Sequence, residues 1–352
     1  MVQRMTAEFT SRIQYNIVTA RYPVPQAEWK RMTFVEKLDE QLFGGSSIKE
    51  ITRRFDPEII YSDSALYAAQ FELMSLLSPR RPLILHLRGD WWREHSAAFE
   101  LMPWRKRILS MQQYSYNWTA AALASKITPI CGWLQEVVRH HLPWKRTEIV
   151  YQGVDSEQFQ PEAGLEVQEP AVAIIQNHSI YPKVEGLLIF RAVVEKLPQV
   201  HFYIAEGEAW AQQFLPLVKK RYAGFTNVHF VKGITSTPAV RKLLTACNCY
   251  VLASGLDCCP TTVLEASLIE KPVLASHVGG VPEIVADGYT GWTISNEDAH
   301  KWVSKIQILL RDTKLSRRLG RQGRKWVSDN FSWAVIAPHV ERLIIEEAER
   351  RR

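Results

Sequence analysis

Two acidic residues, eight positions apart, flank the start of a predicted helix in the second half of the chain. Asp257 follows the predicted strand Cys249–Ala253, and Glu265 lies inside the predicted helix Thr261–Glu270. The residues at the start of this helix are of types favoured at helix N-termini, namely Pro260, Thr261 and Thr262. Because a helix N-terminus offers unpaired N–H groups, we predict a ligand with phosphates there and with hydroxyl groups that meet the two carboxylates. The alternative is that Glu265 is a solvated helix residue, which its apolar neighbours disfavour.

Two more segments after predicted strands are suited to phosphate. Gly279 and Gly280 follow the next strand along the chain, and a Gly-Gly turn lets backbone approach a ligand closely. His178 and Lys183 lie in the first loop of the same half, where they could point at a diphosphate. Taken alone, a single His and a single Lys are more often ordinary loop residues.

Short apolar runs alternate with helix-length amphipathic stretches, which is typical of parallel sheets with crossover helices. The predicted strands of the first half are Tyr15–Thr19, Glu58–Tyr61, Leu83–Leu87, Lys126–Ile130 and Glu148–Tyr151. Those of the second half are Ala171–Gln176, His201–Ala205, Val228–Val231, Cys249–Ala253, Pro272–Ala275 and Trp292–Ile294. The predicted helices are Gly186–Lys196, Thr237–Cys247, Thr261–Glu270, Asp298–Leu310, Leu315–Asn330 and Trp333–Arg351.

This pattern predicts an α/β chain of two doubly wound domains that face a crevice. We place the first domain at residues 1–152 and the second at 153–332, with the polar stretch 155–170 as a linker. Ligands of such sheets bind at the carboxyl ends of the strands.

In order along the chain, the motifs of about residues 148–335 resemble glycosyltransferase family 4, the glycosyl transferases group 1, a retaining GT-B group. The matching pieces are Gln152–Asp155, Phe159–Pro161, the Lys183 loop, Asp257–Glu265, Gly279–Glu283 and Asp287–Gly291. The resemblance implies two Rossmann-like domains, the first on the acceptor side and the second binding a nucleotide sugar. It also implies that the helix 333–351 packs back on the first domain.

The resemblance also implies roles for single residues. Glu265 matches the Glu that binds ribose hydroxyls, and Asp257 stands where a Glu contacts the transferred sugar. Lys183 matches the Lys that neutralises the diphosphate, and His178 replaces the Arg of that pair. The loop beside the donor phosphates is matched by Gly279 and Gly280.

The first half matches the family loosely. Nothing in Met1–Tyr22 resembles the first strand and Gly-rich loop of the family, which leaves open whether the N-terminal domain lacks its first βα unit. Arg88 stands where the family often has His after a central strand, and Asp90 follows it. We expect both to face the crevice as catalytic candidates together with Asp257, and we weigh a structural salt bridge equally.

Composition limits the partners. The net charge of +6 and the pI near 9.0 favour an anionic partner. Several of the twelve Trp stand beside Lys or Arg, as in Trp91-Trp92-Arg93, which fits either a membrane surface or ordinary partly buried Trp. No apolar run approaches a membrane span, and the polar N-terminus is unlike a secretory signal, so we expect a cytoplasmic protein that contacts membranes at most peripherally. The five Cys lack the spacing of a metal site, and no metal or other cofactor is expected.

We therefore expect a retaining glycosyltransferase that moves a hexose-type sugar from a UDP- or GDP-linked donor to a glycan or lipid-linked acceptor, without nucleic acid. One alternative is a GT-B sugar-nucleotide epimerase, for which the acid–base candidates are Asp63, His86 and Asp90. The other is a donor-binding, catalytically weak partner subunit, favoured by the missing Gly-rich loop.

Overall fold

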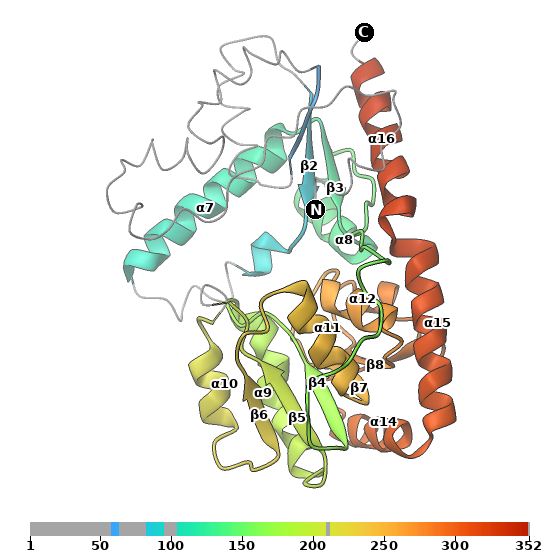
Figure 1. Ribbon diagram of the computed structural model, residues 1–352. Helices are drawn as coiled ribbons and strands as arrows, with labels where there is room; N and C mark the ends of the chain where they lie inside the picture. Colours follow the sequence, from blue (N-terminus) through green and yellow to red (C-terminus); the bar gives the residue numbers. More distant parts are fainter. Residues whose placement is uncertain (1–57, 63–81, 95–103, 209–211, 351–352) are drawn as a thin grey trace.

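The second half of the chain is built on a six-stranded parallel sheet (Figure 1). The computed structural model describes residues 58–62, 82–94, 104–208 and 212–350. The strands of this sheet are β4 (Ala171–Ile174), β5 (His201–Ala205), β6 (Val228–Val231), β7 (Cys249–Leu252), β8 (Val273–Ser276) and β9 (Gly291–Ile294). Their order is β6-β5-β4-β7-β8-β9, so the winding reverses between β4 and β7. In doubly wound sheets this reversal opens a crevice at the carboxyl ends of the two strands.

Helices cover both faces of this sheet. They are α9 (Tyr181–Glu195), α10 (Leu215–Arg221), α11 (Thr237–Ala246), α12 (Thr261–Leu268), α13 (Val281–Ile284), α14 (Ala299–Arg311) and α15 (Thr313–Phe331). Successive residues of β4 face opposite sides, as the pleat of a strand requires. Ile174 packs with Leu187 of α9 and Trp302 of α14, whereas Ala173 lies in the core that includes Leu264 of α12.

The first half contributes a parallel sheet with β2 (Leu83–Leu87) between β1 (Ile60–Ser62) and β3 (Lys126–Pro129). All five residues of β2 are buried, as expected for a central strand covered on both faces. The helices α7 (Trp104–Leu123) and α8 (Gly132–His141) flank β3 in the sequence. The predicted strand Tyr15–Thr19 lies outside the described residues, as does the stretch on which the missing βα unit depends.

The predicted strand Glu148–Tyr151 is wrong. This segment runs beside β3 with only two regular backbone contacts, from Glu148 N–H to the Ile127 carbonyl and from Val150 N–H to the Pro129 carbonyl. The chain then leaves β3 for the second sheet, so the backbone hydrogen bonds end before a strand forms.

The last helix, α16 (Trp333–Glu349), lies against the first sheet rather than the second. Ile336 and Val340 of this helix pack on Ile84 of β2 and on Val150. The domain limits at residues 152 and 332 stay a prediction.

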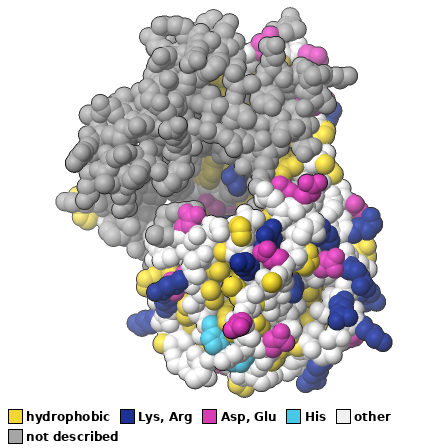
Figure 2. All heavy atoms as spheres, viewed as in Figure 1, with side chains coloured by type: hydrophobic (Ala, Val, Ile, Leu, Met, Phe, Trp, Pro, Cys, Tyr) yellow, Lys and Arg dark blue, Asp and Glu magenta, His cyan; other side chains and the backbone are white. Residues whose placement is uncertain are grey.

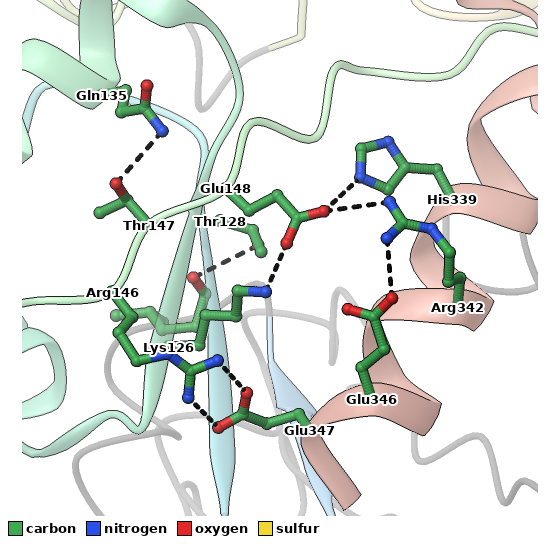
Figure 3. Close-up of polar contacts among 11 residues, drawn as sticks. Lys126, Thr128, Gln135, Arg146, Thr147, Glu148, His339, Arg342, Glu346 and Glu347 are labelled. Atoms are coloured by element: carbon green, nitrogen blue, oxygen red, sulfur yellow. Dashed lines mark hydrogen bonds and ion pairs between the residues drawn. The ribbon is translucent and has the colours of Figure 1, made fainter. Parts of the chain in front are cut away.

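Polar contacts accompany this packing (Figure 3). Arg146 donates two hydrogen bonds to the Glu347 carboxylate, at 2.8 and 2.9 Å. Glu148 accepts from Lys126 of β3 and from His339 of α16, the latter at 2.9 Å. Burial raises the pKa of Glu148, but the hydrogen bonds and charges of Lys126 and His339 outweigh it and lower that pKa to about 2.

The chain passes between the two sheets at two places that lie side by side. Val154 N–H donates to the Phe331 carbonyl at 2.8 Å, and Trp333 N–H donates to the Val154 carbonyl at 3.1 Å. A Cβ at Gly153 would lie 2.2 Å from the Trp333 ring, so the indole covers bare backbone there.

No helix among the residues that the structure describes combines the length and apolar character that crossing a bilayer requires.

Candidate functional site

An ion pair bridges the point where the winding of the large sheet reverses. Lys183 of α9, beyond the carboxyl end of β4, lies 3.2 Å from an oxygen of Asp257, which follows β7. Both side chains are mostly enclosed, with 22% of Lys183 and 10% of Asp257 exposed. Burial alone would lower the pKa of Lys183, but the carboxylates of Asp257 and Glu94 raise it above its usual value. The ammonium group therefore stays charged at neutral pH.

Two glycines bring these loops into contact. A Cβ at Gly186 would lie 2.5 Å from the Ser254 backbone, and one at Gly255 would lie 2.6 Å from the Pro182 carbonyl. Gly255 N–H also donates to that carbonyl at 2.9 Å. The first turn of α9 thus rests on the loop that carries Asp257, which fixes Lys183 beside it.

The start of α12 faces the same edge of the sheet. The N-cap residue of α12 is Pro260, whose side chain makes no hydrogen bond to the first N–H groups of the helix. Thr261 and Thr262 form its first turn, and the Thr262 hydroxyl lies 2.8 Å from the Tyr250 hydroxyl. Tyr250 in turn donates to the Ile175 carbonyl at 2.8 Å, which anchors the turn to β4. The predicted helix start at Thr261 is confirmed.

Glu265 lines a cavity of about 370 Å³ next to this helix start. Burial raises the pKa of Glu265 from its ordinary value of 4.5 to about 7. No charged neighbour shifts this pKa among the residues that the structure describes. Such a half-buried carboxyl group suits ligand hydroxyls, which can hydrogen-bond to it in either protonation state. The other residues around the cavity are Asn177, Glu208, Ile234, Thr235, Ser236, Thr237, Val240, Thr261 and Thr262.

Gly279 and Gly280 pack backbone against backbone on the Asp257 loop. Gly279 has a φ of 52°, a conformation that favours glycine, and a Cβ there would lie 2.1 Å from the Asp257 carbonyl. Gly280 N–H donates to the same carbonyl at 3.1 Å. The two glycines therefore hold the Asp257 loop in place. The sequence predicted only that they would lie beside phosphates.

His178 lies inside the fold, whereas the sequence placed it in a loop that could point at a diphosphate. Its side chain is fully buried, and Nε2 lies 2.9 Å from the Ala205 carbonyl at the end of β5. Burial lowers the pKa of His178, so the ring is neutral at pH 7. The Arg that His178 replaces in the family pattern would be charged at this pH, so His178 contributes less positive charge than that Arg.

The residues expected from the first half are Arg88 and Asp90, and the structure adds Glu94. Asp90 is buried and accepts a hydrogen bond from Arg93 N–H at 3.0 Å, which caps the helical turn 91–94. Arg88 is exposed, directly after β2. Glu94, which the sequence did not single out, has its pKa raised to about 7 by burial, with the Lys183 charge opposing and the Asp257 charge adding. It is thus an acid of the first half near the Lys183–Asp257 pair.

A cavity of about 600 Å³ extends from Asp90 along α8. It is lined mainly by aromatic, imidazole and acidic side chains: Asp90, Trp92, Arg93, Tyr114, Trp133, Glu136, Val137, His140 and His141. Trp92 is 9% exposed and stacks on His141 with ring centroids 4.5 Å apart. Trp92 is therefore a buried residue of the fold, the ordinary alternative that the sequence allowed.

Of the acid–base candidates of the epimerase alternative, His86 lies inside the fold. His86 is buried in β2 against Thr128, its Nδ1 lying 3.2 Å from the hydroxyl, and burial lowers its pKa to about 3. Asp63 lies outside the described residues. In the part of the chain that the structure describes, no three His, Cys, Asp or Glu side chains are arranged to hold a metal ion.

The described surface of the second half mixes charges of both signs (Figure 2). Lys and Arg side chains gather along its right-hand edge, where Figure 1 places α14 and α15.

Residues 158–326 match the family model described as glycosyl transferases group 1. Alpha-maltose-1-phosphate synthase of Mycolicibacterium smegmatis is 25% identical over 264 residues, or 67% of this chain and 68% of that protein. GDP-mannose-dependent alpha-(1-6)-phosphatidylinositol monomannoside mannosyltransferase of the same organism is 23% identical over 331 residues, or 87% of this chain and 81% of that protein.

Two solved structures share the fold. Sucrose-phosphate synthase from Thermosynechococcus elongatus superposes with a TM-score of 0.71 at 19% identity, over 95% of this chain and 84% of that one. HepE from Anabaena, in complex with UDP and glucose, superposes with a TM-score of 0.66 at 17% identity, over 84% of this chain and 79% of that one. These likenesses establish the GT-B fold. The segment that matches the family model contains Lys183, Asp257 and Glu265, and the chain is a glycosyltransferase similar to the glycosyl transferases group 1 over that segment.

Proposed function

We propose that the enzyme transfers a hexose-type sugar from a UDP- or GDP-linked donor to a glycan or lipid-linked acceptor, with retention at the anomeric carbon. The observation that carries the proposal is the Lys183–Asp257 pair at the winding reversal, with the uncapped start of α12 and the Glu265 cavity beside it. A nucleotide sugar supplies matching groups for each of these features. Relatives that use GDP-mannose or hold UDP support either base.

In this arrangement Lys183 and the start of α12 bind the diphosphate, Glu265 binds the ribose hydroxyls and Asp257 contacts the sugar. As the bond between the anomeric carbon and the diphosphate oxygen breaks, negative charge grows on the leaving group. The ammonium of Lys183 and the helix N–H groups stabilise that charge, so the transfer needs no metal ion. The acceptor hydroxyl bonds to the anomeric carbon and gives up its proton, for which we assign no base.

The cavity along α8 is the proposed acceptor site. Sugars stack on aromatic rings and donate hydroxyl hydrogens to carboxylates, and this cavity offers Trp133, Tyr114, Asp90 and Glu136. Membrane contact during the approach of a lipid-linked acceptor stays a proposal, supported by Trp144, which is 64% exposed beside Lys145.

The test incubates the purified protein with a panel of UDP- and GDP-sugars and possible acceptors. Nucleotide release with a product of unchanged anomeric configuration, read by NMR, is the expected result. Interconversion of the donor sugar would identify an epimerase, and binding without turnover would identify a donor-binding subunit.

The site assignment has its own test. Glu265→Gln is expected to weaken donor binding about tenfold, since it removes an acceptor for ligand hydroxyls. Glu297→Gln makes the same change on an exposed loop of the same half and serves as control. Equal donor affinity of the two variants would refute the assignment.

A further inference from the structure

One carboxylate of the second half is held by groups of the first half. Glu283, on the short helix α13, accepts hydrogen bonds from Gly132 N–H at 2.7 Å and from Trp133 N–H at 2.8 Å. It also accepts one from the Tyr151 hydroxyl at 2.9 Å. The three donors come from residues about 130 to 150 positions earlier in the chain.

Glu283 acts as the charged cap of α8. The N-cap residue of this helix is Cys131, whose sulfur accepts from Leu134 N–H at 3.4 Å, and a thiol is a weak acceptor. The Glu283 carboxylate accepts from the N–H groups of Gly132 and Trp133, the first two residues of α8, and lies at the positive end of the helix dipole. A Cβ at Gly132 would lie 3.2 Å from the carboxylate, so glycine leaves room for it.

The same stretch of chain contacts the donor loop on its other side. Gly280, three residues before Glu283, donates to the Asp257 carbonyl at 3.1 Å. A Cβ at Gly280 would lie 2.1 Å from the Cys258 carbonyl and 2.6 Å from the Cys131 sulfur. The Asp257 loop, α13 and the start of α8 are therefore in continuous close contact.

Tyr151 extends this contact to the place where the chain passes between the sheets. Its ring packs edge-on against Phe331, with centroids 5.3 Å apart, and Phe331 accepts from Val154 N–H. Glu283 thus joins three parts: the donor loop, the helix that lines the proposed acceptor cavity, and the crossing of the chain.

We propose that Glu283 is a positioning residue of the transfer reaction, which sets the distance between the bound donor and the acceptor cavity through the start of α8. The proposal rests on the proposed function for its catalytic part. Glu283 contacts neither substrate in this arrangement, so its removal should leave donor affinity intact and slow the reaction of the bound pair. Trp133 carries the effect, since its N–H binds Glu283 and its side chain lines the cavity.

A kinetic comparison tests the catalytic part, with Glu283→Ala, Glu283→Gln and the control Glu297→Gln. We expect kcat to fall about a hundredfold in the Ala variant and about tenfold in the Gln variant, which keeps one acceptor oxygen. The donor dissociation constant should stay within about twofold of that of the parent protein. A variant that loses thermal stability but keeps the parent kcat would show a purely structural cap and overturn the proposal. The Gln variant keeps this comparison possible if the Ala variant fails to fold.

Hydrogen exchange tests the coupling without any need for turnover. Saturating UDP or GDP should slow amide exchange in residues 132–138 of the parent protein and leave it unchanged in Glu283→Ala. Protection that persists in the variant, or that is absent in the parent, overturns the proposal. A parent protein that shows this protection but transfers no sugar would contradict the proposed function while supporting the coupling.

Discussion

The Lys183 ammonium lies 3.2 Å from the Asp257 carboxylate across the winding reversal of the large sheet. An incoming diphosphate must therefore compete with a carboxylate for this cation. Because His178 is buried and burial lowers the pKa of its ring, Lys183 would supply, in the proposed function, the charge that two side chains share in the family pattern. Donor binding should depend strongly on this one ion pair.

Replacing Lys183 by Met should weaken nucleotide-diphosphate binding by about tenfold to a hundredfold, the range for losing a charge-assisted hydrogen bond. Lys301→Met, an exposed position on α14, is the matched control. Asp257→Asn should instead tighten the binding of free UDP or GDP, since it frees the ammonium group. Calorimetric titration measures both effects, and weaker nucleotide binding by the Asn variant would contradict the competition.

The raised pKa of Glu265 predicts how stability depends on pH. Its folded-state pKa of about 7 lies above the ordinary 4.5, so the folded state binds the proton more tightly than the unfolded state. The resulting stabilisation is complete below pH 4.5 and is lost as the pH rises through 7, and it amounts to at most about 3 kcal/mol. Unfolding by urea at pH 5 and pH 8 should show this loss in the parent protein and not in Glu265→Gln.

The proposed acceptor cavity predicts that changes there affect the acceptor KM and not the donor KM. Trp133→Ala should raise the acceptor KM about tenfold, because it removes a stacking surface worth about 1 kcal/mol or more, and should leave the donor KM unchanged. Trp144→Ala, at an exposed Trp outside the cavity, controls for general loss of aromatic surface. Equal acceptor KM values for the two variants would exclude the cavity as the acceptor site.

The contacts of α16 predict the response to acid. The pKa of Glu148 is lowered to about 2, so its contribution to stability is present above about pH 4.5 and is lost as the pH falls through 2. Because this side chain is 27% exposed and solvent screens it, the contribution should be about 1 kcal/mol. Melting temperatures of the parent protein and Glu148→Gln should therefore differ at pH 6 and converge near pH 2. A constant difference would show that charge is not the cause.

The large sheet and its helices could largely be predicted from the sequence. Strands such as His201–Ala205 and Val228–Val231 are confirmed at both ends, since apolar runs between polar turns mark buried parallel strands clearly. The helices α7, α8 and α10 were missed. The sequence of α7 has no strong apolar stripe, with polar residues such as Gln112, Gln113 and Asn117 along it.

The meeting of Lys183 and Asp257 could be predicted, because each lies shortly after a predicted strand of the second half. Lys183 and Asp257, 74 positions apart in the chain, meet because both follow strands at the winding reversal. The burial of His178 beside the Ala205 carbonyl could not be predicted, because the sequence shows it only as one residue of a loop between a strand and a helix. Glu94 could not be found, and Glu283 was noted only as the end of a matching motif, since no local pattern records their interactions with residues far away in the chain.

The side-by-side passage of the chain at Val154 and Trp333 has a consequence for protein engineering. A chimaera that takes the donor half from one relative and the acceptor half from another needs two splice points, and here both lie at a single seam. The Gly153 backbone beneath the Trp333 indole, together with the paired backbone hydrogen bonds, would be the pieces to keep from one parent. Glu283 and the first turn of α8 would also have to come from the same parent, because the carboxylate binds two N–H groups of that turn.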